Sequence, residues 1–342
     1  MKTIYLLLAI TIILTFSNCE KLSFEEEPMN NPEALFENFW TTFNDEYASF
    51  EVRGVDWDAE YDRFRNQVNM QTSDEELKGI FKQMLRTLDD GHVSLVLPNE
   101  EIFRSNLIYD QEIGRELFDL ELIKTKYMDG EYLEDDYKWN TYGWIGNTGY
   151  LSILGFRDNL LQMNDILDYF EKADGLIIDL RANGGGDFTY ALTEFGRLTN
   201  EERFVFKSRT KTGKGKDDYT EWYDWHLSPS GEYFDKPLVL LTDRLTISAG
   251  ERAVMALKTL PNLTHLGDTT NGAFATKIGK ELANGWNYSL VAQQLKYVDG
   301  KDYEGTGMPP DFYMKNTIEE INSGTDKILE EALEIIYQNS IR

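Results

Sequence analysis

The feature that most constrains the fold of this chain is an alternation of apolar runs and helical segments that begins at Gly149. A strand made from one of these runs has no polar side to turn toward solvent, and such strands occur in sheets that helices cover on both faces. The predicted strands are 150–154, 175–180, 204–207, 237–242, 263–267 and 288–294, with helices from about Phe188 and Ala249 and a last helix over 326–337. The sequence therefore predicts an α/β domain with a buried sheet.

A group of three amphipathic helices precedes this domain. Asn31 and Pro32 provide a cap and a first-turn proline, and Ser73 with Glu76 makes a capping box. Large apolar residues recur at helical spacing over 35–43, 57–68 and 77–88. We predict a small N-terminal helical domain over 31–90 with these residues as its core. The α/β core follows over 91–342, opening with a strand over 93–97 and carrying an irregular, acidic and aromatic insert over 98–142.

The first residues have the pattern of an export signal. Lys2 precedes an apolar run over 4–16 that is too short to cross a bilayer, and Cys19 follows it closely. This position resembles the lipobox of bacterial lipoproteins, in which the cysteine is acylated and becomes the mature N-terminus. We expect a signal peptide over 1–18, a polar tether over 19–30, lipidation at Cys19, and a membrane-anchored protein in the periplasm or at the outer membrane or cell surface. The alternative is a plain signal peptide with an incidental cysteine.

The charge balance argues against nucleic acid as a partner. Asp and Glu number 60 against 34 Lys and Arg, a formal net charge of −26. Nucleic-acid binding depends on clustered Lys and Arg that contact phosphates. Three histidines and one cysteine, all far apart in the sequence, also form no ligand cluster, so neither a metal nor an organic cofactor is expected.

Ser248 is the strongest candidate for a nucleophile. It follows the predicted strand 237–242 and opens the next helix, so its hydroxyl projects from a tight connection beside the free N–H groups of a helix N-terminus. The Gly-x-Ser-x-Gly signature is absent. The alternative for such a serine is a simple helix cap.

A serine nucleophile needs a base, and the three histidines are the candidates. His92 lies in a Gly turn between a helix and a strand, His226 in the predicted loop 222–226, and His265 inside a predicted strand. Each could equally be structural. Residues 179–187 end a buried strand with three consecutive glycines, which expose backbone N–H groups. Neither phosphate-loop spacing is present, so an oxyanion hole fits better than a phosphate cradle.

Taken together, these segments resemble the tail-specific, or C-terminal processing, serine peptidases. The resemblance implies a crotonase/ClpP-like α/β core of mixed sheet and helices, joined to the small three-helix N-terminal domain, and a serine endopeptidase that cleaves peptides or unfolded polypeptides through an acyl-enzyme. It rests on six features in the family's order: the helical region, residues 89–92, 179–186, 246–251, 267–272 and 304–311.

Within the family the chain is similar to the tricorn-core branch, whose base is a histidine after Asp-Gly. The resemblance assigns Ser248 as nucleophile, His92 as base and Glu304 as the acid that orients the imidazole. It also assigns Glu251 a supporting role, and the N–H groups of Gly185 and Ala249 to the oxyanion hole. In the Ser–Lys branch a lysine would stand near residues 271–274, where none is present, although Lys277 is close in sequence.

The segment between His92 and Tyr150 is too short for the PDZ domain that many family members carry. Residues 98–142 could capture substrate in its place. Two other functions are compatible with the same fold. One is a non-catalytic peptide- or ligand-binding protein. The other is an acyl-CoA enzyme, which the absence of a basic cluster for CoA phosphates and the predicted export argue against.

Overall fold

The computed structural model describes residues 29–128, 130–157 and 161–341. The predicted signal peptide, Cys19 and most of the tether lie outside these residues. Among the described residues, no helix is long and apolar enough to cross a membrane.

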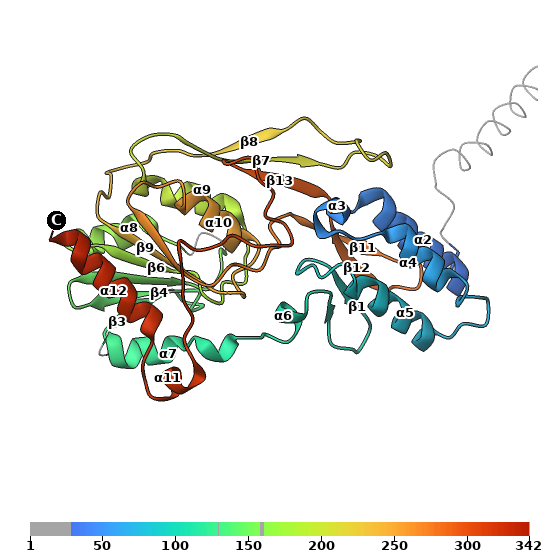
Figure 1. The fold of residues 1–342 in the computed structure, drawn as a ribbon, viewed down its shortest axis with the longest axis horizontal. Helices are drawn as coiled ribbons and strands as arrows, with labels where there is room; N and C mark the ends of the chain where they lie inside the picture. The colour runs from blue at the N-terminus through green and yellow to red at the C-terminus, as the bar shows by residue number, and fades with distance from the viewer. Residues whose placement is uncertain (1–28, 129, 158–160, 342) are drawn as a thin grey trace, which may run out of the picture.

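The α/β domain, in the left half of Figure 1, is built around a central mixed sheet of seven strands. Five neighbouring strands are parallel, and the last two continue the sheet in antiparallel pairing at one edge. In spatial order the strands are β14 (Phe312–Tyr313), β10 (Leu263–Gly267), β9 (Leu238–Thr242), β6 (Leu176–Asp179), β5 (Thr148–Ile153), β4 (Asn140–Ile145) and β3 (Tyr132–Glu134). The predicted α/β class with a mixed sheet is therefore confirmed.

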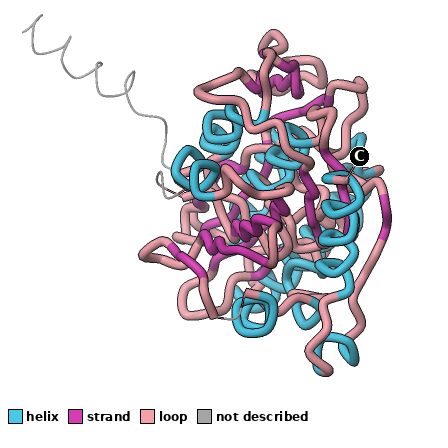
Figure 2. Tube along the Cα trace, turned by 90° about the vertical axis from the view of Figure 1, so that its left-hand side faces the viewer, coloured by secondary structure: helices cyan, strands magenta, loops and turns pink. Residues whose placement is uncertain are grey.

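Helices cover both faces of this sheet, as the apolar strands require. Alternate residues of β6 and β9 belong to two separate cores, so Ile178 and Leu240 face one layer while Ile177 and Val239 face the other. The first layer contains α8 (Met163–Tyr169), α9 (Phe188–Glu194) and α10 (Ala249–Leu257), and the second contains α12 (Lys327–Ser340). Figure 2 shows the helices in cyan on either side of the magenta strands.

The N-terminal helices pack on a second sheet whose strands come from two distant parts of the chain. The helices are α2 (Pro32–Glu46), α3 (Phe50–Arg53), α4 (Trp57–Arg65) and α5 (Asp74–Arg86). The antiparallel sheet runs in the order β11 (Lys277–Glu281), β12 (Asn287–Val291), β1 (Ser94–Val96) and β2 (Phe103–Arg104). The Tyr288 ring of β12 lies 5.6 Å from the Phe43 ring and 5.2 Å from the Phe39 ring. A hairpin far along the sequence thus completes the hydrophobic core of the N-terminal helices.

Two predicted elements differ in the structure. The single strand predicted over 288–294 is two strands, β12 and β13 (Gln293–Tyr297), which belong to different sheets. The change occurs where the Val291 carbonyl accepts from the Ala48 N–H, at 2.9 Å, and the Ala292 carbonyl accepts from the Lys211 N–H, at 2.8 Å. An apolar pattern does not reveal such a change of partner.

The second difference concerns residues 222–226, which we predicted as a loop. They lie mostly in β8 (Tyr223–Leu227), which pairs with β7 (Arg203–Thr210) and so extends the β13 sheet.

The segment 98–142 contains short elements: β2, α6 (Leu107–Asp110), a 3₁₀ turn (Arg115–Leu117), α7 (Leu120–Leu122), a π-helical stretch (Ile123–Tyr127), β3 and the start of β4. Two further short helices are a 3₁₀ helix (Phe195–Leu198) and α11 (Ile318–Asn322).

Candidate active site

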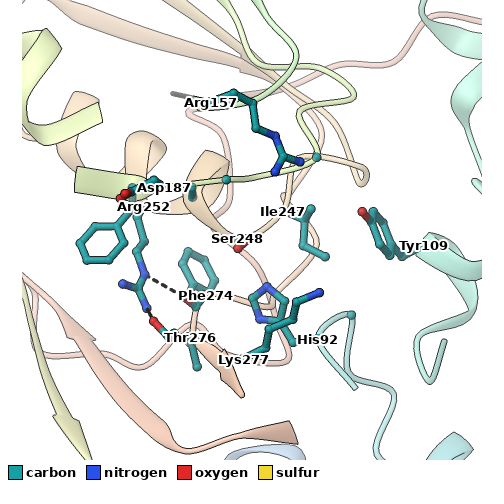
Figure 3. A pocket seen from close by; sticks show the side chains of 16 residues that line it. His92, Tyr109, Arg157, Asp187, Ile247, Ser248, Arg252, Phe274, Thr276 and Lys277 are labelled. Atoms are coloured by element: carbon teal, nitrogen blue, oxygen red, sulfur yellow. Dashed lines mark hydrogen bonds between the residues drawn. The ribbon is translucent and has the colours of Figure 1, made fainter. Parts of the chain in front are cut away.

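Ser248 occupies a strained position at the start of α10. Its φ of 63° and ψ of −120° are uncommon for a residue with a side chain. The connection from β9 is held by Asp243, whose carboxylate accepts the N–H groups of Leu245 and Thr246, each at 2.9 Å. Ser248 lines a cavity of about 480 Å³ (Figure 3). The sequence-predicted nucleophile therefore stands at an open cavity, on a tight turn between strand and helix.

His92 lines the same cavity. A Cβ on Gly91 would lie 2.6 Å from the Ile247 Cδ1 atom, so only glycine lets the 89–92 turn pack against the residue next to Ser248. Burial lowers the pKa of His92 to about 4, while the charge of Asp90 acts in the opposite direction. The imidazole is consequently neutral at pH 7 and able to accept a proton. Its Nδ1 atom has no hydrogen-bond partner among the described residues.

Glu304 is buried near the cavity but makes its hydrogen bonds elsewhere. Its Oε1 atom accepts from Arg53 Nη2 at 2.8 Å, and its Oε2 atom accepts from the N–H groups of Phe274 and Ala275 at 2.9 and 3.1 Å. None of its hydrogen bonds with described residues goes to His92. Burial raises the pKa of Glu304 to about 8 against the opposing charge of Arg53. In this structure Glu304 holds the loop that forms the cavity wall, and the predicted orienting contact to the imidazole is not made.

Glu251 ties the nucleophile to that same loop. Its carboxylate accepts from the Ser248 N–H at 3.2 Å and from the N–H groups of Gly272 and Ala273 at 2.6 and 2.8 Å. The Thr270 hydroxyl donates a fourth hydrogen bond at 2.6 Å. Burial raises the pKa of Glu251 to about 7, and these hydrogen bonds lower it. The contacts fit the supporting role that we predicted for Glu251.

The two predicted oxyanion donors differ in availability. Ala249 is the first residue of α10, so its N–H has no partner within the helix. Gly185 lies so close to Ser248 that a Cβ on it would be 2.6 Å from the serine Cβ, but its N–H donates to Asn183 Oδ1 at 2.9 Å. The next glycine, Gly186, lines the cavity, and its N–H makes no hydrogen bond with the described residues. Three consecutive glycines in a sequence do not reveal which N–H is free.

Sequence reasoning also missed Arg53, which joins the parts of the site. It is the last residue of α3, and its side chain is only 5% exposed. Its Nη1 atom donates to the Asp89 carbonyl at 2.6 Å, and its Nη2 atom donates to the Gly272 carbonyl at 2.7 Å as well as to Glu304. One arginine thus connects the turn before His92 to the loop beside Ser248. A lone arginine at the end of a short helix carries no sequence signal for this role.

The remaining candidates lie in different places. Lys277 is exposed at the start of β11 and lines the Ser248 cavity together with His92. His226 is exposed on β8. His265 is buried in β10, where its ring contacts the Thr242 hydroxyl at 2.8 Å and the Lys258 ammonium at 3.3 Å. Across the described part of the chain, no three His, Cys, Asp or Glu side chains gather where they could hold a metal ion.

Comparisons with known proteins identify the family and the fold. Residues 147–314 match the model of peptidase family S41, and residues 28–86 match the tricorn protease C1 domain. A candidate peptidase from Parabacteroides merdae ATCC 43184, solved by crystallography, superposes with a TM-score of 0.81 at 28% identity, covering 90% of this chain and 97% of that one. The predicted fold is therefore that of solved relatives over nearly the whole chain.

Two curated relatives match about half of the chain. The carboxy-terminal processing protease CtpA of Bacillus subtilis (strain 168) is 27% identical over 167 residues, which are 48% of this chain and 34% of that protein. The nisin-resistance protein of Lactococcus lactis subsp. lactis is 23% identical over 183 residues, which are 50% of this chain and 58% of that protein. The chain thus matches about a third of one relative and somewhat more than half of the other.

Proposed function

Because the chain belongs to peptidase family S41, we propose that it is an exported serine endopeptidase that hydrolyses peptide bonds in peptides or unfolded polypeptides. The observation that carries this proposal is the strained, cavity-lining Ser248, which shares its cavity with a neutral imidazole and with unpaired backbone N–H groups. These are a nucleophile, a base and an oxyanion site that line one open cavity.

The proposed reaction is acyl transfer in two stages. His92 removes the proton from the Ser248 hydroxyl as its oxygen attacks the scissile carbonyl, and the new oxyanion accepts hydrogen bonds from the N–H groups of Ala249 and a glycine of the 184–186 turn. The imidazolium then gives its proton to the leaving amine, and the C–N bond breaks. A water molecule, activated by the same imidazole, hydrolyses the ester and restores Ser248.

For the acid that stabilises the imidazolium we propose Asp90, in place of Glu304, which the resemblance suggests. Asp90 accepts the backbone N–H of His92 at 2.8 Å, and its negative charge favours the protonated ring. Glu304, which we expected in this role, stabilises the wall of the cavity through Arg53, Phe274 and Ala275. Among the described residues the Gly186 N–H has no acceptor, whereas the Gly185 N–H already donates to Asn183. Substrate binding would have to release Gly185 from Asn183 for the predicted pair of donors to act.

The test is mass-spectrometric detection of cleavage in a mixture of peptides and unfolded proteins. Ser248→Ala and His92→Ala should each lower the rate by at least about 10³-fold, because both remove a group that acts in the transition state. His226→Ala is the matched control, since His226 is exposed on β8 away from the cavity. Cleavage that persists in Ser248→Ala would contradict the proposal, and peptide binding without cleavage by the parent chain would favour the binding-protein alternative.

We also propose that the protein is exported and anchored through an acylated Cys19. The proposal rests on the apolar run and the cysteine that follows it, which lie outside the described residues. The mature parent protein should partition into detergent, and Cys19→Ser should move it to the aqueous phase. An unchanged partition would indicate a plain secreted protein.

A further inference from the structure

The cavity around Ser248 has a charge opposite to that of the chain as a whole. The protein carries a formal net charge of −26, yet three cationic side chains line this cavity: Arg157, Arg252 and Lys277. They approach it from different elements (Figure 3). The lining contains one carboxylate, Asp187, which is occupied as the N-cap of α9. Cationic side chains therefore outnumber carboxylates in the lining of the candidate active site.

Arg252 is the most unusual of the three because it is buried and forms no ion pair with any described residue. It is 3% exposed, and its guanidinium donates only to neutral acceptors: the Phe274 carbonyl at 2.8 Å, Thr276 Oγ1 at 3.1 Å and Gln293 Oε1 at 3.0 Å. It also lies 4.1 Å above the Phe188 ring. Burial lowers the pKa of Arg252 to about 10, while the charges of Glu304 and Glu251 act in the opposite direction. A buried cation of this kind is costly unless an anion reaches it.

Lys277 and Arg157 add charge that no described carboxylate neutralises. Lys277 is exposed at the start of β11 and forms no ion pair with any described residue. Arg157 is also exposed, and its guanidinium lies 4.9 Å above the Trp139 ring. By contrast Lys280, on the same strand as Lys277, is paired with Glu46. The two unpaired cations flank the position where a substrate would meet Ser248.

We propose that this cavity contains a carboxylate-binding subsite, formed by Arg252, Arg157 and Lys277, which selects substrates that carry an acidic group next to the scissile bond. The inference rests on the proposed peptidase function and specifies its substrate class. A cationic cavity in an acidic protein attracts anionic groups, and here it draws them toward Ser248. The carboxylate can come from a Glu or Asp side chain or from the C-terminus of the substrate.

Binding to the full chain carrying Ser248→Ala tests this subsite independently of turnover. Three degenerate peptide pools carry Glu, Gln or Lys at one central position, and each pool is made with a free and with an amidated C-terminus. We expect the Glu pool to bind about tenfold more tightly than the Gln pool, because hydrogen bonds to charged groups are the stronger kind. If a free C-terminus gives the same gain while Glu gives none, the carboxylate is that of the chain end.

Charge-reversal variants distinguish the effect of the subsite cations on peptide binding from the effect of the protein's net charge. Lys277→Glu and Arg157→Glu should each abolish the preference for Glu over Gln and favour the Lys pool, whereas Lys280→Glu should keep the parent preference. Equal affinity for all pools and both chain ends, absence of binding by every pool, or an equal loss of preference in Lys280→Glu would overturn the subsite. Cleavage by the parent chain is measured separately. A chain that prefers carboxylates but does not cleave would contradict the peptidase function and leave the subsite supported.

Discussion

Two buried arginines in this molecule, Arg181 and Arg53, have the same kinds of partner, but they connect different kinds of structural element. Each lies between two carboxylates, and in each case a tyrosine hydroxyl donates to one of those carboxylates at 2.7 Å. Arg181 pairs with Asp179 at 2.6 Å and with Asp326 at 2.8 Å. Arg53 pairs with Glu304 at 2.8 Å and lies 3.4 Å from Asp90.

The Arg181 cluster connects regular elements. Asp179 ends β6, and Asp326 caps α12 by accepting the Leu329 N–H at 3.1 Å. The cluster therefore attaches the C-terminal helix to the central sheet. The Arg53 cluster instead reaches the backbone of two irregular loops, through the carbonyls of Asp89 and Gly272. The comparison teaches that similar buried ion pairs can serve stability in one region and the geometry of a site in another.

We expect the largest effect, a loss of stability, when Arg181 is replaced. Arg181→Met leaves Asp179 and Asp326 buried without their cation, which should lower the free energy of unfolding by about 3–5 kcal/mol. Urea denaturation of the variant and the parent chain measures this loss. A loss below about 1 kcal/mol would show that the cluster does not hold α12 to the sheet.

The second prediction concerns Arg53 and the cleavage rate. Arg53→Met frees the turn before His92 and the loop beside Ser248, and small displacements of catalytic groups can cost about 10²-fold, or about 2.7 kcal/mol of barrier. We expect that loss in kcat/KM, measured at a temperature where the variant is folded. Arg53→Lys should recover only part of it, because a lysine cannot donate to both loops in a fixed planar geometry. Full activity in Arg53→Met would show that the Arg53 cluster does not control the geometry of the site, and so would contradict the difference drawn between the two clusters.

The smallest expected effect is a pH dependence of the unfolding free energy. It arises from His265 in β10, a strand of the central sheet to which the Arg181 cluster attaches α12. Burial lowers the pKa of His265 to about 3, below the value of about 6.5 in an unfolded chain. The unfolded state then binds more protons, so stability is lost as the pH falls from 6.5 toward 3. Between pH 7 and 5.5 this loss should be about 1 kcal/mol.

His265→Gln tests the assignment because it cannot titrate in this range. Denaturant unfolding at several pH values should give a flatter profile for the variant than for the parent chain. The Arg53 region is expected to contribute in both directions, since burial lowers the pKa of His92 but raises that of Glu304. If the unfolding free energy of His265→Gln depends on pH as steeply as that of the parent chain, the acid sensitivity would instead arise in the Arg53 region.

Much of this architecture was predictable because it depends on local patterns. The apolar runs at β5, β6, β9 and β10 have no solvent side, so they specify a covered sheet wherever they pair. Ser73 with Glu76 forms the capping box that the sequence predicted, and the start of α10 at Ser248 follows from the strand–turn–helix pattern. Ser248 was predicted from the strand–turn–helix pattern and His92 from the family resemblance, and both line one cavity.

The sequence by itself thus determined the fold class, most of the elements and the candidate nucleophile, since each depends on residues near one another in the chain, and the family resemblance added the candidate base. Tertiary structure decided which groups are free. It assigned the Gly185 N–H to Asn183, directed Glu304 to Arg53 and left Arg252 without an ion pair among the described residues. It also joined the β11–β12 hairpin to the N-terminal helices. Hydrogen-bond partners, burial and charge compensation depend on segments that meet only in the folded molecule, and no local pattern contains them.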